Sequence, residues 1–322
     1  MTMLSRTLGR TGLKVSPVGL GTVEIGNVYG LGPRTLPSEE EVIRLLQQAV
    51  ELGVTFIDTA RSYGVAEERI RKSGIGKNPN VIISTKCCLA FEKNDDIAPD
   101  DMRRMMREEV EESLRVLKIE RIPLLQLHGG SERMIKSGII QETMEKLKRE
   151  GKVGFVGIST RGEEAPLAAI ESGFFDTLQV AHSILDQRMT ARVFPEAQKH
   201  SVGIINRSVL LKGALTPASQ YLVEGLAPLK KGSDKAAKIA QELGMDLPSL
   251  AVRFVLSNPA VNTAIIGSSK LKNIESTVTA AEAGPLPEEV LVQLRQLAID
   301  DPMQMDPSKW KHWNQPRDGK ST

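Results

Sequence analysis

Short apolar runs rich in β-branched residues alternate along the chain with longer segments whose apolar residues recur at helical spacing. Eight of the short runs are typical of buried strands, and polar residues follow each of them. Between the first two, Ser38-Glu39-Glu40-Glu41 predicts a helix that begins with a capping box, and a longer helix is predicted over about 100–117. The predicted strands span residues 17–21, 54–58, 81–85, 123–127, 153–158, 177–180, 203–206 and 262–266.

This alternation predicts an α/β fold, a (β/α)8 TIM barrel, rather than two doubly wound halves. No composition shift and no long linker rich in Pro, Gly or Ser divides the chain, so we expect a single domain over residues 1–322. Residues 4–15 resemble a β-hairpin, which we expect to close the bottom of the barrel. Gly53, Gly151 and Gly173 each stand between a helix and the next strand, where glycine permits the left-handed turn that ends a helix.

Charge and composition argue against several functions. The 42 Lys and Arg against 40 Asp and Glu give a formal charge of +2, which provides no strong field for nucleic acid or an anionic membrane. No apolar run approaches the roughly 18 residues that cross a bilayer, and the N-terminus lacks a signal-peptide core, so we expect a cytoplasmic protein. The only cysteines, Cys87 and Cys88, are adjacent, which suits a reducing compartment. The four histidines lack ligand spacing, and we expect no metal.

Polar side chains stand at or just beyond the ends of nearly all the predicted strands. The active site of a TIM barrel lies at these C-terminal ends, because the βα loops converge there. Any one such residue is more often a helix cap or part of a solvated loop, so the prediction rests on their joint placement. The residues are Thr22, Asp58, Lys86, His128, Ser159, Gln179, Arg207, Ser208, Gly267, Ser268 and Ser269.

Four of the predicted side chains suit proton delivery: Asp58, Tyr63, Lys86 and His128. Lowering a phenol pKa from about 10 to about 7 requires about 4 kcal/mol, which one ammonium at about 4 Å supplies at an effective dielectric near 20. We therefore expect Lys86 to lower the pKa of Tyr63, and Asp58 to keep Lys86 charged. His128 is placed to orient a carbonyl oxygen. These groups include no activated nucleophile, which points to a hydride-donating cofactor.

An anion site is expected where the last strand meets a helix. Gly267, Ser268 and Ser269 place backbone N–H groups at a helix start, which favours phosphate. A dinucleotide pyrophosphate fits there because four cationic side chains are predicted nearby: Arg207, Lys212, Lys270 and Lys272. The glycines of residues 19–26 form no GxGxxG fingerprint and no Walker lysine is present, so we reject a Rossmann or P-loop site.

The chain resembles the aldo-keto reductases over almost its whole length. The resemblance implies a barrel that binds NAD(P)(H) extended, without a Rossmann domain. It places Asp58, Tyr63, Lys86 and His128 at the family's catalytic positions, with Tyr63 as general acid in reduction and general base in oxidation. The segments that carry the likeness are 8–16, 19–22, 53–60 with Tyr63, Gly64 and Glu67, 84–86, and 125–128.

The same resemblance implies the cofactor contacts. Ser159 and Gln179 fall where the family holds the nicotinamide carboxamide, and Thr160 stands where the family usually has Asn. Arg207 falls where a side chain packs on the nicotinamide ring, and Ser208 belongs to the loop over the pyrophosphate. The full predicted cofactor set is Gly21, Thr22, Asp58, Ser159, Thr160, Gln179, Arg207, Ser208, Leu210, Lys212, Gly267, Ser268, Ser269 and Asn273.

Near the adenosine phosphate the sequence departs from the family pattern. Asn273 stands where Arg or Gln is frequent, and Ser276-Thr277 replaces Glu-Asn. Lys270 or Lys272 remains available to pair with a 2′-phosphate, and we expect NADP, with NAD as the alternative.

Substrate selection is expected in the loops over the barrel mouth, at Val23, Glu24, Tyr29, Leu89 and Phe91. Trp310 and Trp313 either pack against the barrel or reach over the site. The leading hypothesis is an oxidoreductase that transfers hydride between nicotinamide C4 and the carbonyl carbon of an aldehyde, ketone or sugar. Two alternatives stay open: an NADP-binding regulatory module with little turnover, and a lyase or isomerase that uses Lys86 as a Schiff-base amine. A small-molecule carbonyl or alcohol is the only partner that the sequence indicates, and it indicates no oligomeric state.

Overall fold

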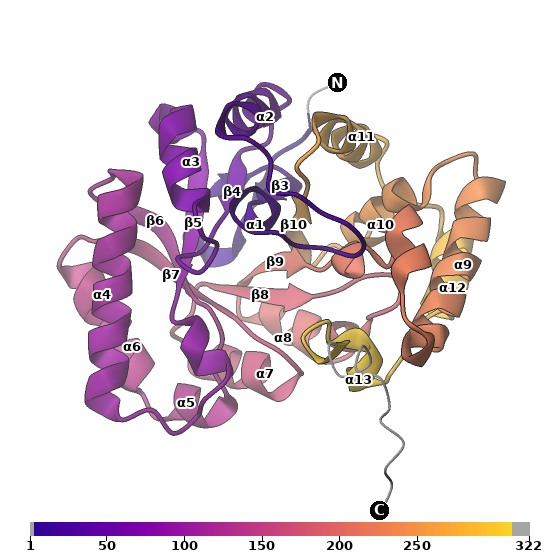
Figure 1. Cartoon of the computed structure of the whole chain (residues 1–322). Helices are drawn as coiled ribbons and strands as arrows, with labels where there is room; N and C mark the ends of the chain where they lie inside the picture. Colours follow the sequence, from indigo (N-terminus) through magenta and orange to yellow (C-terminus); the bar gives the residue numbers. More distant parts are fainter. Residues whose placement is uncertain (1–2, 311–322) are drawn as a thin grey trace, which may run out of the picture.

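The computed structural model describes residues 3–310, and its centre is a closed barrel of parallel strands. The strands follow one another around the barrel in chain order, and Figure 1 shows the helices arranged outside them. Every predicted strand is present, with each end within two residues of its expected position, which confirms the (β/α)8 fold. The strands are β3 (Val18–Gly21), β4 (Phe56–Asp58), β5 (Ile82–Cys87), β6 (Ile122–Leu127), β7 (Val153–Ser159), β8 (Thr177–Ala181), β9 (Gly203–Arg207) and β10 (Val261–Gly267).

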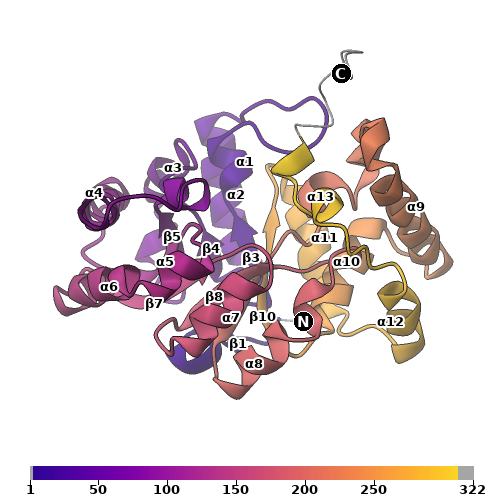
Figure 2. The same cartoon turned by 90° about the horizontal axis from the view of Figure 1, so that it is seen from below.

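The helices cover the outer wall of the barrel, as the second view shows (Figure 2). The α-helices are α1 (Val23–Gly26), α2 (Glu39–Glu51), α3 (Ala66–Ser73), α4 (Pro99–Leu117), α5 (Glu132–Lys136), α6 (Ile139–Arg149), α7 (Glu164–Glu171), α8 (Val193–Lys199), α9 (Ala227–Glu242), α10 (Leu247–Leu256), α11 (Leu271–Glu282), α12 (Glu288–Arg295) and α13 (Pro302–Met305). Short 3₁₀ helices are η1 (Gly9–Thr11), η2 (Ile75–Lys77), η3 (Leu89–Glu92), η4 (Arg188–Thr190), η5 (Leu211–Gly213), η6 (Pro217–Tyr221) and η7 (Glu224–Leu226).

Local signals in the sequence set the ends of several helices. The Ser38 hydroxyl accepts from the backbone N–H of Glu41, and the Glu41 carboxylate accepts from the Ser38 N–H, so the capping box is confirmed at the start of α2. Gly53, Gly151 and Gly173 have φ values of +90°, +77° and +68° at the helix-to-strand turns, as predicted.

A hairpin closes the bottom of the barrel, as predicted. β1 (Arg6–Thr7) and β2 (Lys14–Val15) pair antiparallel. The Arg6 guanidinium donates to the carbonyl oxygens of Leu256 and Val261, which fastens the hairpin to the last strand–helix unit. Because side chains of the hairpin fill this end, the opposite mouth is left for a ligand. The apolar cluster at the bottom comprises Leu8, Val15, Phe56, Ile82, Leu124, Ile205 and Ile265.

The sequence predicts neither a membrane-spanning segment nor a metal site, and the described residues bear on both. Within residues 3–310, no helix is long and apolar enough to span a membrane. Over the same range, no group of three or more His, Cys, Asp or Glu side chains is arranged to hold a metal ion. Cys87 and Cys88 are both buried and carry free thiols.

A buried histidine directly after β8 is expected to make the free energy of unfolding sensitive to acid. The His182 ring packs against Phe194 and Phe254, with Nδ1 3.2 Å from the carbonyl oxygen of Asp186, and burial lowers its pKa to about 4. Below the unfolded-state pKa of about 6.5, the unfolded chain takes up a proton that the folded protein resists. We expect His182 to reduce the free energy of unfolding by about 3 kcal/mol as the pH falls from 7 to 4.

Urea unfolding at pH 7, 5.5 and 4 measures this loss. A His182→Gln protein should lose correspondingly less stability over the same pH range. Equal pH dependence in the unaltered protein and the His182→Gln protein would show that His182 does not resist protonation.

Candidate active site

A cavity of about 1160 Å³ opens at the C-terminal ends of the strands. Every barrel strand contributes to its lining, either directly or through the loop that follows. Three of the four predicted catalytic residues line it, and Lys86 lies buried directly behind them. Of the predicted cofactor residues, all but Ser269 line the cavity. The volume exceeds the roughly 300–1,000 Å³ of ordinary small-molecule sites, so it can hold a dinucleotide together with a small substrate.

The four predicted catalytic side chains lie together at the base of this cavity. Asp58 ends β4, Lys86 lies near the end of β5, His128 directly follows β6, and Tyr63 comes from the loop between β4 and α3. The Lys86 Nζ atom lies 2.7 Å from Asp58 Oδ2 and 5.0 Å from the centre of the Tyr63 ring. The Tyr63 and His128 rings meet edge to face, with their centres 5.5 Å apart.

Lys86 and Asp58 form a fully buried ion pair. Lys86 Nζ also donates to the carbonyl oxygen of Thr59 at 2.9 Å. Burial lowers the pKa of Lys86, and the Asp58 charge acts in the opposite direction, which is the role predicted for Asp58. Two side-chain amides also bind the Asp58 carboxylate. Gln179 and Gln126 donate to its Oδ1 atom at 2.8 and 3.3 Å. Gln179, predicted to hold the carboxamide, therefore contacts the Asp58 carboxylate in this structure.

The expectation that Lys86 lowers the pKa of Tyr63 is wrong for this structure. Burial raises the pKa of the Tyr63 hydroxyl, and the nearby Asp58 carboxylate raises it further. The sequence argument counted the ammonium alone. In the structure Asp58 offsets the Lys86 charge, and a buried phenolate is costly, so the hydroxyl keeps its proton. The hydroxyl is therefore present in the protonated form that a general acid requires, while its raised pKa makes it a weaker acid than a free phenol.

His128 is a neutral imidazole. Burial lowers its pKa to about 2, and the positive charges of Lys86, Arg207 and Arg161 add to the effect. The backbone N–H of His128 donates to the carbonyl oxygen of Cys87, which sets the start of the loop. A neutral imidazole carries one N–H group and one lone pair, so His128 can donate a single hydrogen bond to a ligand.

A buried carboxylate fixes the loop that carries Tyr63. Glu67, at the start of α3, accepts from Thr85 on β5 at 2.6 Å and from Ser113 on α4 at 2.8 Å. It also accepts from the guanidinium of Arg61, two residues before Tyr63. On the other side, a Cβ atom at Gly26 would overlap the carbonyl oxygen of Tyr63, so glycine is required where α1 meets this loop.

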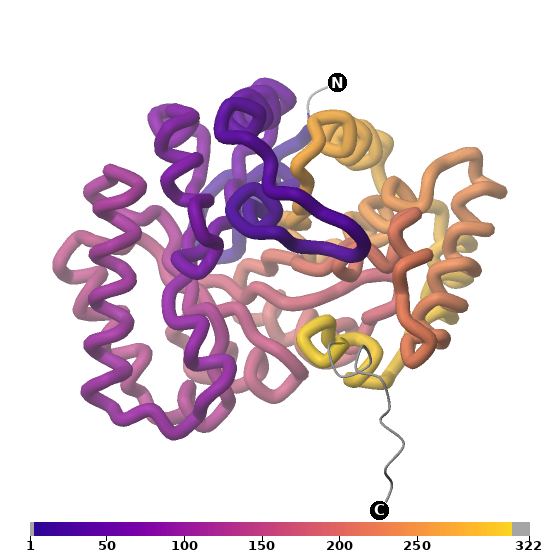
Figure 3. Tube along the Cα trace, viewed as in Figure 1, coloured from indigo at the N-terminus to yellow at the C-terminus, as the bar shows by residue number. Residues whose placement is uncertain are grey.

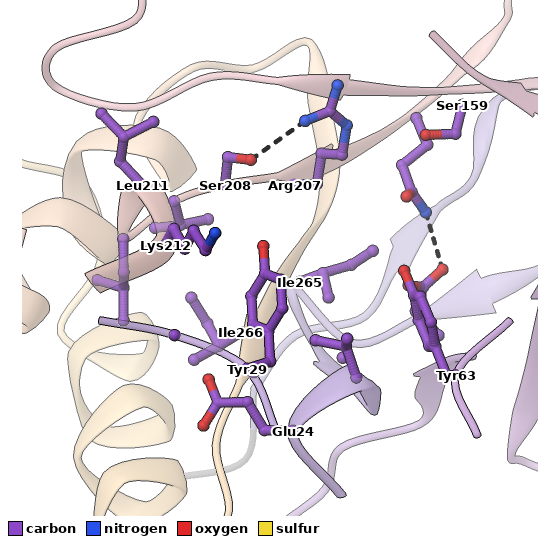
Figure 4. Close-up of a pocket in the computed structure, with 18 of the residues that line it drawn as sticks. Glu24, Tyr29, Tyr63, Ser159, Arg207, Ser208, Leu211, Lys212, Ile265 and Ile266 are labelled. Carbon is purple, nitrogen blue, oxygen red and sulfur yellow. Dashed lines mark hydrogen bonds between the residues drawn. The ribbon is translucent and has the colours of Figure 1, made fainter. Parts of the chain in front are cut away.

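Arg207, at the end of β9, contributes positive charge to the cavity. Arg207 donates to the carbonyl oxygen of Thr160 at 2.8 Å and to the Ser208 hydroxyl at 3.2 Å. Figure 4 shows the Arg207–Ser208 bond with Tyr63 to one side and Lys212 to the other. The guanidinium is thus held by two partners in the cavity wall, where the resemblance places a ring-stacking side chain.

Two polar features fit the predicted nucleotide. Thr160 lines the cavity, and its hydroxyl oxygen is buried without a hydrogen-bond partner, which leaves it open to a ligand amide that reaches it. At the end of β10, Ser268 accepts from the backbone of Lys270 and from the Asn273 amide, which orders the loop before α11.

The cationic groups expected at the adenosine end are not part of the cavity wall. Lys270 and Lys272 are exposed, and neither lines the cavity, while the carboxylate-bearing Asp246 does. Contact of either lysine with a 2′-phosphate therefore requires its flexible side chain to turn inward.

The segment between α1 and α2 contributes Asn27, Tyr29, Gly30 and Arg34 to the cavity lining. Figure 3 shows it running in front of the barrel toward the chain around η5 and η6. The Lys212 ammonium lies 5.4 Å from the centre of the Tyr29 ring, and Gly32 packs against the ring of Tyr221. Beneath this segment, Glu24 faces Gly267, and burial raises the pKa of its carboxyl group while the charge of Arg34 acts against that rise.

The predicted substrate-loop residues mostly reach the cavity. Val23, Glu24, Tyr29, Leu89 and Phe91 all line it. By contrast, Trp310 is buried beside α13, where its indole N–H donates to the carbonyl oxygen of Gln304, which corresponds to the packing alternative. Trp313 lies outside the described residues.

Sequence reasoning missed several side chains that shape the site. Gln126 also donates to Ser84, and Arg161 joins Glu92 to Asp306 at the cavity rim. Gln126 had a signal, since it lies in the strand that leads to His128 at the alternate position that faces inward. Ser62 lies beside Tyr63, and its hydroxyl is 3.2 Å from Nδ1 of His128.

Known proteins resemble this chain over most of its length. An uncharacterised oxidoreductase of Bacillus subtilis, YqkF, is 29% identical over 93% of this chain and 98% of its own length. L-galactose dehydrogenase of Arabidopsis thaliana is 28% identical over 85% of this chain and 87% of its own. The structure of the aldo-keto reductase AKR11C1 from Bacillus halodurans, in its holo form, matches with a TM-score of 0.77 and 27% identity, covering 94% of this chain and all of that one. The Aldo/keto reductase family profile matches residues 17–299, and the chain belongs to that family.

Proposed function

We propose that this protein is an NAD(P)(H)-dependent oxidoreductase that reduces a carbonyl group and oxidises the corresponding alcohol. The observation that carries the proposal is the convergence of Asp58, Tyr63, Lys86 and His128 at the base of one cavity. A binding module has no need of a buried ion pair beside a phenol and a neutral imidazole. Family membership supports the same reaction class.

In this proposal the chain's own residues handle the proton. His128 binds the carbonyl oxygen through its single N–H group and orients it against the Tyr63 hydroxyl. Tyr63 gives its proton to that oxygen as negative charge develops on it. The resulting phenolate lies beside the Lys86 ammonium, which Asp58 keeps protonated and whose charge Asp58 partly offsets. The acceptor becomes a strongly basic alkoxide as the hydride arrives, so proton transfer from Tyr63 is downhill in spite of the raised pKa. In oxidation of an alcohol the same groups act in reverse, with Tyr63 as the base.

The cavity fits a nicotinamide cofactor held across the barrel mouth. We assign the carboxamide to Ser159, Thr160 and Gln179, on the ground that the buried Thr160 hydroxyl lacks a partner. The ring is assigned to Arg207. The phosphates are assigned to the side chains of Ser208, Lys212 and Ser268 and to the backbone N–H group of Gly267, with Gly21, Thr22, Leu210 and Asn273 completing the contacts. When bound, the cofactor supplies or accepts the hydride at the carbonyl carbon.

We further propose NADP as the cofactor, with NAD as the alternative, and an aldehyde, ketone or sugar as the substrate. The cavity wall carries many polar side chains beyond the cofactor set, among them Glu24, Asn94 and Asp95, which suits a hydroxylated substrate. The L-galactose dehydrogenase relative supports the sugar class. We also propose that residues 1–322 form one domain.

A cofactor titration followed by a substrate panel tests the proposal. We expect NADPH or NADH to bind with quenching of its fluorescence, and bound cofactor to be oxidised over many turnovers by at least one carbonyl compound. Binding without turnover on a broad panel of aldehydes, ketones and sugars would instead favour the regulatory module. Absence of binding, together with borohydride trapping of a substrate on Lys86, would favour the lyase or isomerase.

A further inference from the structure

Ser62 contacts the imidazole that the proposed function places on the carbonyl oxygen. Its hydroxyl oxygen lies 3.2 Å from Nδ1 of His128, within hydrogen-bond distance. Ser62 directly precedes Tyr63 in the loop after β4, and both Ser62 and His128 line the cavity.

The backbone around Ser62 is fixed from two sides. Its carbonyl oxygen accepts from the side-chain amide of Asn27 at 3.2 Å, and the backbone N–H of Arg61 donates to the carbonyl oxygen of Lys86 at 2.9 Å. The distance between the Ser62 hydroxyl and His128 is therefore set by the same elements that place Tyr63 and Lys86.

The position of one proton on His128 decides what the ring can do. A neutral imidazole carries its proton on either Nδ1 or Nε2, and the hydrogen bond at one nitrogen determines the state of the other. Within residues 3–310, Ser62 is the residue whose side chain bonds a ring nitrogen of His128. A serine hydroxyl can donate or accept, so the contact is compatible with both forms.

The chemistry of a carbonyl substrate selects one of the two forms. A carbonyl oxygen only accepts hydrogen bonds, so the ring must present an N–H group to it. Since Nδ1 faces Ser62, that group has to be Nε2–H. Nδ1 then carries the lone pair, and Ser62 must donate to it.

We propose that Ser62 is a positioning residue that holds His128 with its proton on Nε2 by donating its hydroxyl to Nδ1. The proposal rests on the proposed function, because only a ligand that accepts at Nε2 gives this form a use. Ser62 itself does not touch the reacting atoms in this account. Ser62 keeps the proton of His128 on Nε2 before a ligand binds, so the ring can donate to the ligand at once.

Nitrogen NMR on the full-length protein tests the proposal without any turnover. With ¹⁵N-labelled histidine, protonated and unprotonated ring nitrogens give separate signals, and a His128→Gln protein identifies which of the four histidines is His128. We expect a protonated Nε2 and an unprotonated Nδ1 in the unaltered protein. A proton on Nδ1 there would overturn the proposal without any variant.

Two variants test whether the Ser62 hydroxyl sets the position of the proton on His128. Ser62→Ala should give His128 signals that shift toward a mixture of the two forms, whereas Ser62→Thr, which keeps a hydroxyl, should preserve the Nε2–H form. Unchanged signals in the Ser62→Ala protein would mean that another influence sets the proton position, and the proposal would fail.

Kinetics supply the functional measurement. Loss of one such hydrogen bond corresponds to about a tenfold change. We therefore expect Ser62→Ala to lower kcat/KM for a carbonyl substrate about tenfold, with unchanged cofactor affinity and most of the activity restored in Ser62→Thr. Ser137→Ala is the control, because it removes a hydroxyl that bonds the carbonyl oxygen of Met134 at the end of α5, and Ser137 is not among the residues that line the cavity. An equal loss in both alanine proteins would make the effect nonspecific and contradict the proposal.

The proposed function and the positioning role of Ser62 can be contradicted separately. If the unaltered protein turns over no carbonyl compound, the proposed function fails, while the NMR result still decides what Ser62 does to His128. If turnover is present and the proton lies on Nδ1, the positioning role fails and the proposed function stands.

Discussion

Tyr63→Phe is expected to lower the kcat of carbonyl reduction by about 10²–10⁴-fold while cofactor affinity stays the same. The substitution removes only the hydroxyl oxygen, and the ring keeps its edge-to-face contact with His128 and its place 5.0 Å from the Lys86 ammonium. The loop that carries the ring is held by Glu67 and is not altered. The measurement is multiple-turnover oxidation of NADPH or NADH, with cofactor binding followed separately by fluorescence quenching.

Tyr221 provides the matched control for this variant. Its side chain is exposed and does not line the cavity, so Tyr221→Phe removes the same hydroxyl from a site without a chemical role. We expect its kcat to stay within about twofold of the unaltered protein. A Tyr63→Phe protein with comparable activity would refute the acid–base role of Tyr63.

The pH profile distinguishes the structure from the simpler sequence argument. Burial and the Asp58 charge raise the pKa of Tyr63, so the hydroxyl retains its proton well above neutral pH. The rate of reduction should therefore remain level between about pH 6 and pH 9. A phenol with its pKa lowered to about 7 would instead give a reduction rate that falls above pH 7. Such a fall in the unaltered protein, measured at saturating substrate, would contradict the raised pKa. It would restore the expectation that Lys86 lowers the pKa of Tyr63.

The barrel could be predicted because each of its strands is buried on both faces and bounded by glycine or polar residues. The run 153–158, for example, differs from β7 by a single residue, since Gly151 marks its start and Ser159 its end. The hairpin was also predictable, since residues 4–15 precede the first strand without helical spacing. In these places the local pattern and the tertiary structure demand the same conformation.

Placement in the site was predictable in the same way, because strand ends meet at one mouth of a barrel. The partners of each side chain were not. Gln179 bonds Asp58 from a strand about 120 residues away, and no local pattern indicates a contact of that kind. The direction of the Tyr63 pKa shift was missed for the same reason, since it depends on burial and on the distance to Asp58. Ser269 shows the limit of a motif, because it lies two residues after Gly267 in the sequence but is not among the residues that line the cavity.

Asp58→Asn should destabilise the protein by about 3–5 kcal/mol at pH 7, which is the typical cost of breaking a buried ion pair. The variant leaves the Lys86 ammonium fully buried, with the carbonyl oxygen of Thr59 as its remaining bond among the described residues. Burial already lowers the pKa of Lys86, and without the Asp58 charge that pKa falls further below the unfolded value of about 10.4. Urea unfolding of both proteins measures the deficit.

The direction in which the stability deficit of Asp58→Asn changes with pH shows whether the buried Lys86 charge causes it. Where the folded pKa of a lysine lies below its unfolded pKa, stability is lost as the pH falls below the unfolded value, so the deficit of Asp58→Asn should shrink from pH 7 toward pH 10. Asp186→Asn is the control: it breaks the pair with Arg188, whose guanidinium does not lose its proton in this range, so its deficit should stay level. A deficit of Asp58→Asn that is also level up to pH 10 would mean that Lys86 keeps its proton without Asp58, and that the carboxylate serves the site only through Gln126 and Gln179.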